Sequence, residues 1–328
     1  MIANINYNEK GNLPLVSIII PTKNRYELVK GAIENVLLQT YSNFEVIVVE
    51  DGSSSGIEDY IRKLNNNKIV YHRHSEQKGL GAARNTGTRI AKGEYVAFLD
   101  DDDRWIEEKI SLQYDLISRY NDEKIMIYCG NIRLNQNGLS EESIPKSKGK
   151  MSKFFFNGYC IGSSCMMIPR ELLLSIGGHS EDLTSCIDHD LWLKLSLAGF
   201  RMDFVPKGLV YSIKHTNQRM MEDIDERLKG INQFFRKWEK IVKDQAVQKG
   251  WENIERIYHV QTATMLVNKF ATGLISRREL YNYLRVLFSI VELDYNYLDL
   301  IISSFGKVHY TPISKSKLKI FRKLRSML

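Results

Sequence analysis

The sequence has few cysteines and no long hydrophobic run. No stretch approaches the ~18 consecutive apolar residues of a membrane-spanning helix, and residues 1–12 are polar, without the apolar segment of a signal peptide. The four cysteines, Cys129, Cys160, Cys165 and Cys186, include no Cys-x-x-Cys pair, which is typical of buried thiols in a reducing compartment. We therefore expect the protein in the cytoplasm or peripherally at the inner face of the cell membrane.

Signature motifs of several common enzyme classes are also missing. The chain contains no Walker A loop, no Gly-x-Gly-x-x-Gly fingerprint, no Gly-x-Ser-x-Gly elbow and no His-Glu-x-x-His pair. The 328 residues, 43% hydrophobic and 26% charged, have the composition of a globular protein with one large domain and an appendage. The net charge of +7 is compatible with phosphate-bearing ligands or anionic membranes and does not choose between them.

The first half of the chain alternates strand and helix signals. Apolar runs bounded by turn residues predict strands over 15–20, 44–49, 68–72 and 95–99, with Pro21 ending the first. Helical patterns occupy 27–39, 56–65, 79–92 and 107–120. This order predicts an α/β fold in which a mixed, mainly parallel, Rossmann-like sheet carries helices on both faces.

The rest of the chain changes character twice. Residues 125–210 mix short strands with loops, and the polar stretch 135–153 is expected to be a flexible loop near the site. From about residue 221 the apolar residues fall at helical spacing, and Ser276 and Glu279 form a capping-box pattern before a helix over 280–291. We therefore divide the chain into a catalytic domain, 1–220, and a helical C-terminal domain, 221–328.

Three polar clusters follow three of the predicted strands. They are 21–25, 50–53 and 100–103. Ligand sites in open α/β sheets lie beyond the carboxyl ends of the strands, and parallel strands bring these ends to one rim. Topology alone therefore predicts a site at this rim.

The last of these clusters consists of four adjacent aspartates, Asp100 to Asp103. Ionised together they repel one another unless a cation or solvent screens them. Asp100 and Asp102 alternate along an extended segment, so their carboxylates can converge on a hard divalent cation such as Mg²⁺ or Mn²⁺. The other interpretation is a solvated acidic turn that caps the next helix, and it applies above all to Asp103.

The segment 79–85 opens a predicted helix with two glycines and contains Arg84. Exposed N–H groups at a helix start attract anions, and Arg84 adds a partner for phosphate or carboxylate. A plain glycine-started helix explains the same residues equally well.

Taken together, these segments resemble the inverting family 2 glycosyltransferases with the GT-A fold. The match runs through Val16 to Arg25, Val48 to Ser53, Gly81 to Asp103 and Asp188 to Lys194, and it covers about residues 14–216. The resemblance implies a nucleotide-sugar site and a DxD metal motif. In it, Pro21 and Thr22 lie against the nucleotide base, Asp51 bonds the edge of the base, Asn24, Arg25 and Asp101 bind the nucleotide sugar, Arg84 lies near the base or phosphates, Asp100 lies near the ribose, and Asp102 and His215 approach the metal.

Two of these assignments carry alternatives. The fourth aspartate leaves the register of the DxD motif open by one residue, and a lone histidine such as His215 is more often structural. The resemblance also implies that Asp188 is the catalytic base, although Ile187 and His189 depart from the family pattern around it. Asp190 is the competitor for that role, and we interpret it as the N-cap of a helix over 191–197.

The function implied is an inverting, metal-dependent transfer of a hexose or N-acetylhexosamine from a UDP-sugar to an acceptor hydroxyl. The acceptor is a glycan, a lipid-linked sugar or a protein, in bacterial surface polysaccharide or glycoconjugate assembly. Alternatives are a nucleotidyltransferase that makes nucleotide sugars and a non-catalytic nucleotide- or glycan-binding subunit. Fold analogy alone supports the pathway.

The final segment, 315–328, carries six basic residues and no acidic one. Its apolar residues approximate a helical stripe, so it is either a basic amphipathic helix on an anionic membrane or a solvated terminal helix. The helical region is also expected to shape the acceptor site or a homo-oligomer interface. We expect no nucleic-acid partner.

Overall fold

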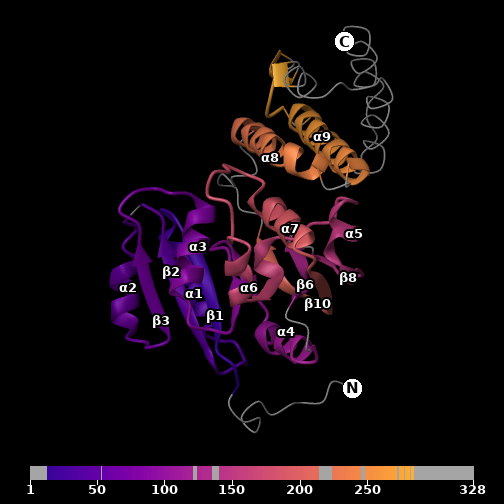
Figure 1. The fold of residues 1–328 in the computed structure, drawn as a ribbon. Coiled ribbons are helices and arrows are strands. Elements are labelled where there is room, and N and C mark those ends of the chain that lie inside the picture. Colours follow the sequence, from indigo (N-terminus) through magenta and orange to yellow (C-terminus); the bar gives the residue numbers. More distant parts are fainter. Residues whose placement is uncertain are drawn as a thin grey trace. The chain divides into compact units, whose positions relative to one another are not determined.

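The computed structural model describes residues 13–52, 54–120, 124–134, 140–213, 224–244, 248–271, 273–276, 278–280 and 282–283. The chain divides into two compact units (Figure 1). Unit 1 runs to Asp223 but omits 156–158, and unit 2 consists of 156–158 together with the chain from Ile224. Within the described residues, no helix is both long and apolar enough to cross a bilayer.

Unit 1 is built on a mixed sheet with the strand order β3-β2-β1-β4-β9-β6-β10-β5. These strands are β3 (Ile69–Arg73), β2 (Phe44–Glu50), β1 (Val16–Thr22), β4 (Tyr95–Phe98), β9 (Met166–Pro169), β6 (Ile125–Leu134), β10 (Arg201–Ile213) and β5 (Asp103–Trp105). The first four are mutually parallel, and β6 and β10 are parallel to each other. Antiparallel pairing joins β9 to β4 and β6, and β5 to β10.

Helices cover both faces of this sheet because its central strands are apolar on both sides. Its helices are α1 (Tyr26–Val36), α2 (Ile57–Leu64), α3 (Leu80–Ile90), α4 (Lys109–Ile117), α5 (Met151–Phe155), α6 (Arg170–Ser175) and α7 (Ile187–Leu197), with a 3₁₀ turn η1 (Ser163–Cys165). Ile18 and Ile20 of β1 belong to the core that α1, α2 and α4 complete. Ile19 points to the opposite face, where a Cβ on Gly87 of α3 would lie 2.4 Å from its Cγ2.

The strands and helices expected in the first half are present, with boundaries shifted by a few residues. One difference is that β1 continues through Pro21 to Thr22 and does not end before the proline. The missing N–H of Pro21 is on the side of β4, because strand residues alternate and Ile19 O accepts from Leu99 N on that side. The β1–β4 ladder ends at the Ile19–Phe98 pair, so the proline removes no bond within it.

The expectation of a loop over 135–153 is wrong for 140–143 and 149–153, which form strands and the start of α5, while 135–139 lie outside the described residues. Strand β7 (Ser140–Ser143) pairs with β6, and β8 (Gly149–Lys150) pairs with β10. The polar composition misled because β7 is an exposed strand, whose polar side chains face water and whose backbone pairs along one edge.

In unit 2, α8 (Ile224–Asp244) packs on α9 (Gln248–Ala271) through aromatic side chains. The ring of Phe234 stacks on Tyr258 at 5.8 Å, and Phe235 meets Trp251 edge-on at 5.2 Å. The capping box is confirmed: Ser276 N donates to Glu279 Oε2, and Glu279 N donates to Ser276 Oγ, at 2.7 and 3.2 Å.

A buried polar network closes the sheet at the end opposite the carboxyl ends of β1 and β2. Ser17 Oγ donates to Glu45 Oε1 at 2.6 Å and accepts from Gly93 N at 2.8 Å, and Lys92 N donates to the same Glu45 oxygen. Ser17 is fully buried. The network therefore holds the connection from α3 into β4, the strand that leads to the four aspartates.

Ser17→Ala should lower the free energy of unfolding by about 1–3 kcal/mol, because it leaves a buried N–H and a buried carboxylate oxygen without this partner. Chemical denaturation checks the value. Ser175→Ala, which removes an exposed hydroxyl bonded to Leu172 O, is the control and should change it by less than about 0.5 kcal/mol. Equal effects of the two variants would contradict the role of the network.

Candidate active site

The polar clusters predicted after β1, β2 and β4 lie together at the carboxyl ends of these strands. Thr22 pairs in register with Glu50 at the ends of β1 and β2. Thr22 Oγ1 also donates to Asp101 Oδ2 at 2.7 Å. This bond ties the end of β1 to the segment 100–103 that follows β4, here called the aspartate turn. The turn therefore lies directly beside the end of β1.

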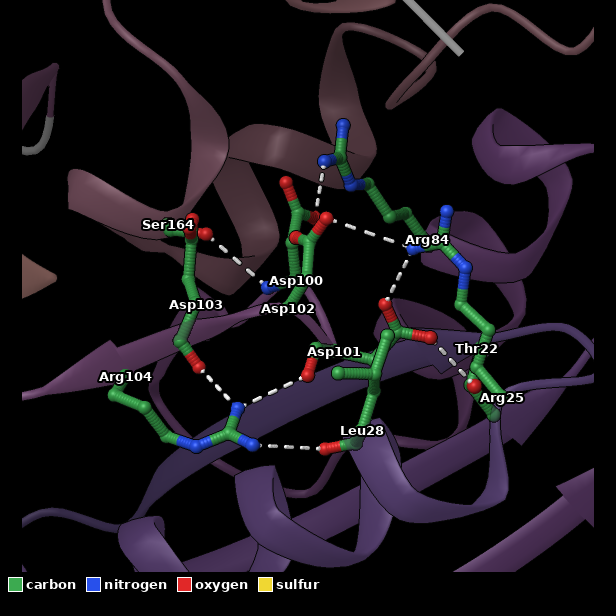
Figure 2. A network of polar contacts seen from close by, with 10 residues as sticks. All are labelled: Thr22, Arg25, Leu28, Arg84, Asp100, Asp101, Asp102, Asp103, Arg104 and Ser164. Carbon is green, nitrogen blue, oxygen red and sulfur yellow. Dashed lines mark hydrogen bonds and ion pairs between the residues drawn. The ribbon is translucent and has the colours of Figure 1, made fainter. Parts of the chain in front are cut away.

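The aspartate turn is neutralised in part by Arg25, at the start of α1 (Figure 2). Arg25 Nη1 lies 3.0 Å from Asp101 Oδ1 and 3.5 Å from Asp102 Oδ2. Burial is the largest influence on Asp101 and raises the pKa of this carboxyl above its ordinary value, although Thr22 and Arg25 act in the opposite direction.

The backbone of the same turn is held by Arg104. Its Nη1 donates to Asp101 O at 3.0 Å and to Asp103 O at 2.6 Å, and its Nη2 donates to Leu28 O of α1 at 3.2 Å (Figure 2). The guanidinium lies against Gly31, where a Cβ would come within 2.3 Å of Nη2. The turn is thus fastened to α1 by contacts to its backbone carbonyls.

The suggestion that Asp103 caps the next helix is wrong. Asp103 is buried in β5, where it pairs with Ser212, and α4 begins only at Lys109, after Glu108 as its N-cap. The four aspartates therefore have different environments, and Asp103 belongs to the sheet.

Arg84 of α3 is the most enclosed cation of the site, with 1% of its side chain exposed. Its Nη2 lies 2.7 Å from Asp100 Oδ1, and its Nη1 lies 2.8 Å from Asp188 Oδ1. Burial acts against its charge, but the two carboxylates outweigh it and keep the pKa of Arg84 above the ordinary value. Arg84 therefore joins the aspartate turn to the candidate base, and both of its terminal nitrogens are already engaged by carboxylates.

Asp188, in the first turn of α7, is oriented through one of its oxygens. Oδ1 accepts from Arg84 Nη1 and, at 2.5 Å, from the hydroxyl of the buried Ser163 in η1. Burial acts to raise the pKa of Asp188, yet Arg84 and Ser163 outweigh it and hold the pKa below the ordinary value. Within the described residues Oδ2 has no such partner, and 28% of the side chain is exposed. This arrangement suits a carboxylate that accepts a proton from an incoming group.

The interpretation of Asp190 as an N-cap is wrong. Helix α7 already begins at Ile187 with Cys186 as its N-cap, so Asp190 lies inside the first turn. Its fully buried carboxylate accepts from Ser180 Oγ at 2.6 Å and lies 3.3 Å from Lys194 Nζ. Asp188 and Asp190 thus have separate partners on separate faces of the helix.

Asp51 follows β2 and is held by the segment that leads into α3. Its Oδ1 accepts from Lys78 N and from His74 Nδ1, and its Oδ2 accepts from Gly79 N, each at 2.8 Å. Burial acts to raise the pKa of Asp51, but these donors outweigh it and lower the pKa below the ordinary value. Three donors occupy three of the four acceptor positions of a carboxylate, so one position on Oδ2 remains for a ligand N–H.

The other predicted residues have different surroundings. Pro21 and Thr22 are buried in β1, whereas Asn24 is exposed with a φ of 54°. Burial raises the pKa of Asp100 despite the cation of Arg84. No group of three or more His, Cys, Asp or Glu side chains among the described residues forms a ready metal site, and His215 lies outside them.

Three residues of this region were not singled out in the sequence. Ser163 and His74 position Asp188 and Asp51, and His179 packs edge-on against Phe98 with ring centroids 4.9 Å apart. Burial, followed by the charge of Arg84, lowers the pKa of His179 to about 3, so this side chain is neutral. Serine and histidine occur throughout the chain, and no local pattern marks these three.

Comparison with known proteins agrees with the geometry. Residues 17–177 match the family model described as Glycosyl transferase family 2. An uncharacterized glycosyltransferase of Rickettsia typhi is 34% identical over 62% of this chain and 66% of its own length, and one of Rickettsia prowazekii is 31% identical over 70% and 75%. The Escherichia coli protein named UDP-Glc:alpha-D-GlcNAc-diphosphoundecaprenol beta-1,3-glucosyltransferase WfaP is 31% identical over 58% and 73%.

These relatives differ in length. The chain covers less than a third, 27–31%, of three other Rickettsia glycosyltransferases, which are 32–34% identical to it in the matched region. The similarity therefore concerns a shared domain, and it does not extend over the whole of those longer proteins.

Solved structures share the fold at low sequence identity. The S. aureus TarS fragment 1–349 in complex with UDP-GlcNAc matches with a TM-score of 0.62 at 18% identity, over 87% of this chain and 83% of that one. GalNAc-T7 with UDP, GalNAc and Mn²⁺ matches with a TM-score of 0.54 at 17% identity, over 70% and 48%. By its sheet, its family model and its relatives, the chain belongs to glycosyltransferase family 2 and has the GT-A fold.

Proposed function

We propose that this chain moves a hexose or N-acetylhexosamine from a UDP-sugar to an acceptor hydroxyl, with inversion at the anomeric carbon and Asp188 as the base. The observation that carries the proposal is the arrangement around Arg84. On one side of this cation is the aspartate turn, and on the other is a separate carboxylate with one oxygen available. Donor and acceptor chemistry thus have distinct groups within one buried ion network.

The nucleotide assignment is supported by Asp51. Its remaining acceptor position fits an imide N–H, which uracil has and which an ionised carboxylate recognises well. A relative named for UDP-Glc and two structural neighbours that contain UDP-GlcNAc or UDP support the same donor class. In this proposal Pro21, Thr22, Asn24 and Arg25 line the nucleotide-sugar site with Asp51.

A divalent cation fits the charges at the turn. When ionised, Asp100, Asp101, Asp102 and Asp188 carry four negative charges and face two guanidinium groups, which leaves an excess of two negative charges. Mg²⁺ and Mn²⁺ take hard oxygen ligands, and Mg²⁺ commonly uses only one or two carboxylates together with substrate phosphates. Asp102, with Asp100 beside it, would hold the ion, which when bound offsets charge on the departing diphosphate.

The protein groups perform the remaining steps. Arg84 adds fixed positive charge behind the turn, at a site where solvent screening is weak. The hydroxyl oxygen of the acceptor attacks the anomeric carbon from the face opposite the diphosphate, and Asp188 Oδ2 takes the proton of that hydroxyl. A single attack of this kind inverts the anomeric centre. No protein nucleophile is needed, which agrees with a single available carboxylate at the base position.

The acceptor is assigned only by class. WfaP is named for a lipid-linked sugar acceptor and another relative for colanic acid biosynthesis, which supports a glycan or lipid-linked acceptor in bacterial polysaccharide assembly. Contact with the inner membrane face would bring the enzyme to such an acceptor. The basic segment 315–328, proposed for this contact, lies outside the described residues.

A thermal-shift screen of nucleotide sugars tests the donor. UDP-sugars should raise the melting temperature, because a ligand that binds the native state adds about 3 kcal/mol to the free energy of unfolding at 100 times its Kd. In this proposal they do so only when Mg²⁺ or Mn²⁺ is present. Asp51→Asn should weaken the shift. Preference for GDP- or dTDP-sugars would contradict the base assignment, and consumption of UTP with a sugar phosphate would indicate a nucleotidyltransferase.

Asp188→Asn should reduce turnover by roughly 10²- to 10⁴-fold, because the amide cannot accept the acceptor proton. Donor binding in the thermal-shift assay should be preserved, since the substitution keeps the shape of the side chain. Turnover is measured as UDP released with acceptor present. Retained turnover would remove Asp188 from the mechanism, and a wild-type protein that binds donor without turnover would indicate a non-catalytic subunit.

Ser163→Ala should move the acidic limb of the kcat/KM profile to higher pH. The Ser163 hydroxyl helps to hold the pKa of Asp188 below its ordinary value, and the base works only when deprotonated, so activity falls as pH falls through that pKa. Ser164→Ala is the matched control, since this hydroxyl contacts Asp100 N and not Asp188. A limb that stays in place or moves to lower pH in Ser163→Ala would contradict the positioning role.

A further inference from the structure

Gly162, directly before η1, has no evident structural reason to be glycine. Its φ of −64° and ψ of 151° are angles that any L-residue adopts. It is exposed, and among the described residues a Cβ built on it would meet only one atom within 4 Å, Asp188 Oδ2 at 4.0 Å. Neither backbone conformation nor packing therefore excludes a side chain here.

The other described glycines of unit 1 all have such a reason. More than half have a positive φ, between 60° and 120°, which favours glycine. The remainder have ordinary φ values, but a Cβ on any of them would lie 2.1–2.7 Å from a neighbouring atom. This second set is Gly31, Gly81, Gly87, Gly93, Gly130 and Gly208. Among the described glycines of unit 1, Gly162 alone has neither reason, and it lies beside Asp188 Oδ2, the oxygen that the proposed chemistry uses.

The space beside Asp188 Oδ2 is also where an attacking alcohol must place its carbon. A hydroxyl bonded to a carboxylate oxygen at about 2.7 Å brings its own carbon to about 3.5 Å from that oxygen. A Cβ at 4.0 Å would occupy the same shell around Oδ2. A hydroxyl on a sugar ring needs the most room, because its carbon carries two further ring atoms.

We propose that Gly162 is a specificity-determining residue, whose missing side chain leaves room beside Asp188 for a secondary hydroxyl on a sugar ring. This inference rests on the proposed function. Oδ1 of Asp188 is held by Arg84 and Ser163, so the alcohol approaches Oδ2, and Gly162 borders that approach. Side-chain volume at position 162 therefore limits the acceptor and leaves the donor site unchanged.

The series Gly162→Ala and Gly162→Val tests the inference. The donor is UDP-Glc or UDP-GlcNAc, whichever stabilises the wild type more. The acceptors are the methyl glycosides of glucose, galactose and N-acetylglucosamine and an α-D-GlcNAc diphospholipid. Three quantities are measured: kcat/KM for acceptor, Kd for donor, and the rate of donor hydrolysis by water.

We expect kcat/KM for the sugar acceptor to fall several-fold in Gly162→Ala and at least tenfold in Gly162→Val. Donor Kd and hydrolysis should stay within about twofold, because water is small enough to reach Oδ2 past either side chain. Ser42→Val places the same valine side chain at an exposed position in the loop before β2 and should leave all three quantities unchanged.

Full transfer activity in Gly162→Val would overturn the inference and leave the proposed function intact. A parallel loss of donor affinity and hydrolysis would also overturn it, because the glycine would then be structural. A wild-type protein that neither binds a UDP-sugar nor transfers to any acceptor of the panel would overturn the proposed function, and the inference with it.

Discussion

The interior charge of Arg84 constrains the whole catalytic unit. A guanidinium removed from water costs several kcal/mol unless carboxylates and hydrogen bonds surround it. Here the two carboxylates come from distant parts of the chain: Asp100 is 16 residues away, and Asp188 is 104 residues away. The planar fork of arginine suits this position, because its two terminal nitrogens address two partners at once, which a lysine ammonium does less well. Asp100 and Asp188 are thereby held in one geometry.

The aspartate turn depends on this cation but is organised by other contacts as well. Arg104 donates hydrogen bonds to the carbonyls of Asp101 and Asp103. Asp100 N donates to Ser164 Oγ at 3.1 Å, and Thr22 Oγ1 donates to the Asp101 carboxylate. These contacts use backbone atoms of the turn and the carboxylate of Asp101. Mutual repulsion of the aspartates is thus offset by distributing them among different partners, and Asp102 pairs with Arg25 at 3.5 Å while 16% of its side chain is exposed.

Much of the α/β unit follows from local patterns. Apolar runs bounded by glycine, proline and aspartate mark β1, β2 and β4, and parallel strands place the polar residues after them at one rim. The errors came from residues whose partners are not local. Pro21 continues β1 because β4 ends beside it, and β7 forms because β6 offers an edge for pairing. Capping chemistry predicted Asp190 at the start of a helix, but its carboxylate is buried against Ser180 and Lys194.

Strand and helix positions, the acidic rim and the family resemblance were thus readable from the amino-acid order, because periodicity and turn chemistry act over a few residues. The pairing of Arg84 with Asp188, the hydroxyl of Ser163 on the same carboxylate and the open space at Gly162 were not. Each of these features depends on how η1 and α7 pack against α3 and the aspartate turn. That placement is set by the packing of the whole sheet and its helices, and no short segment of the chain encodes it.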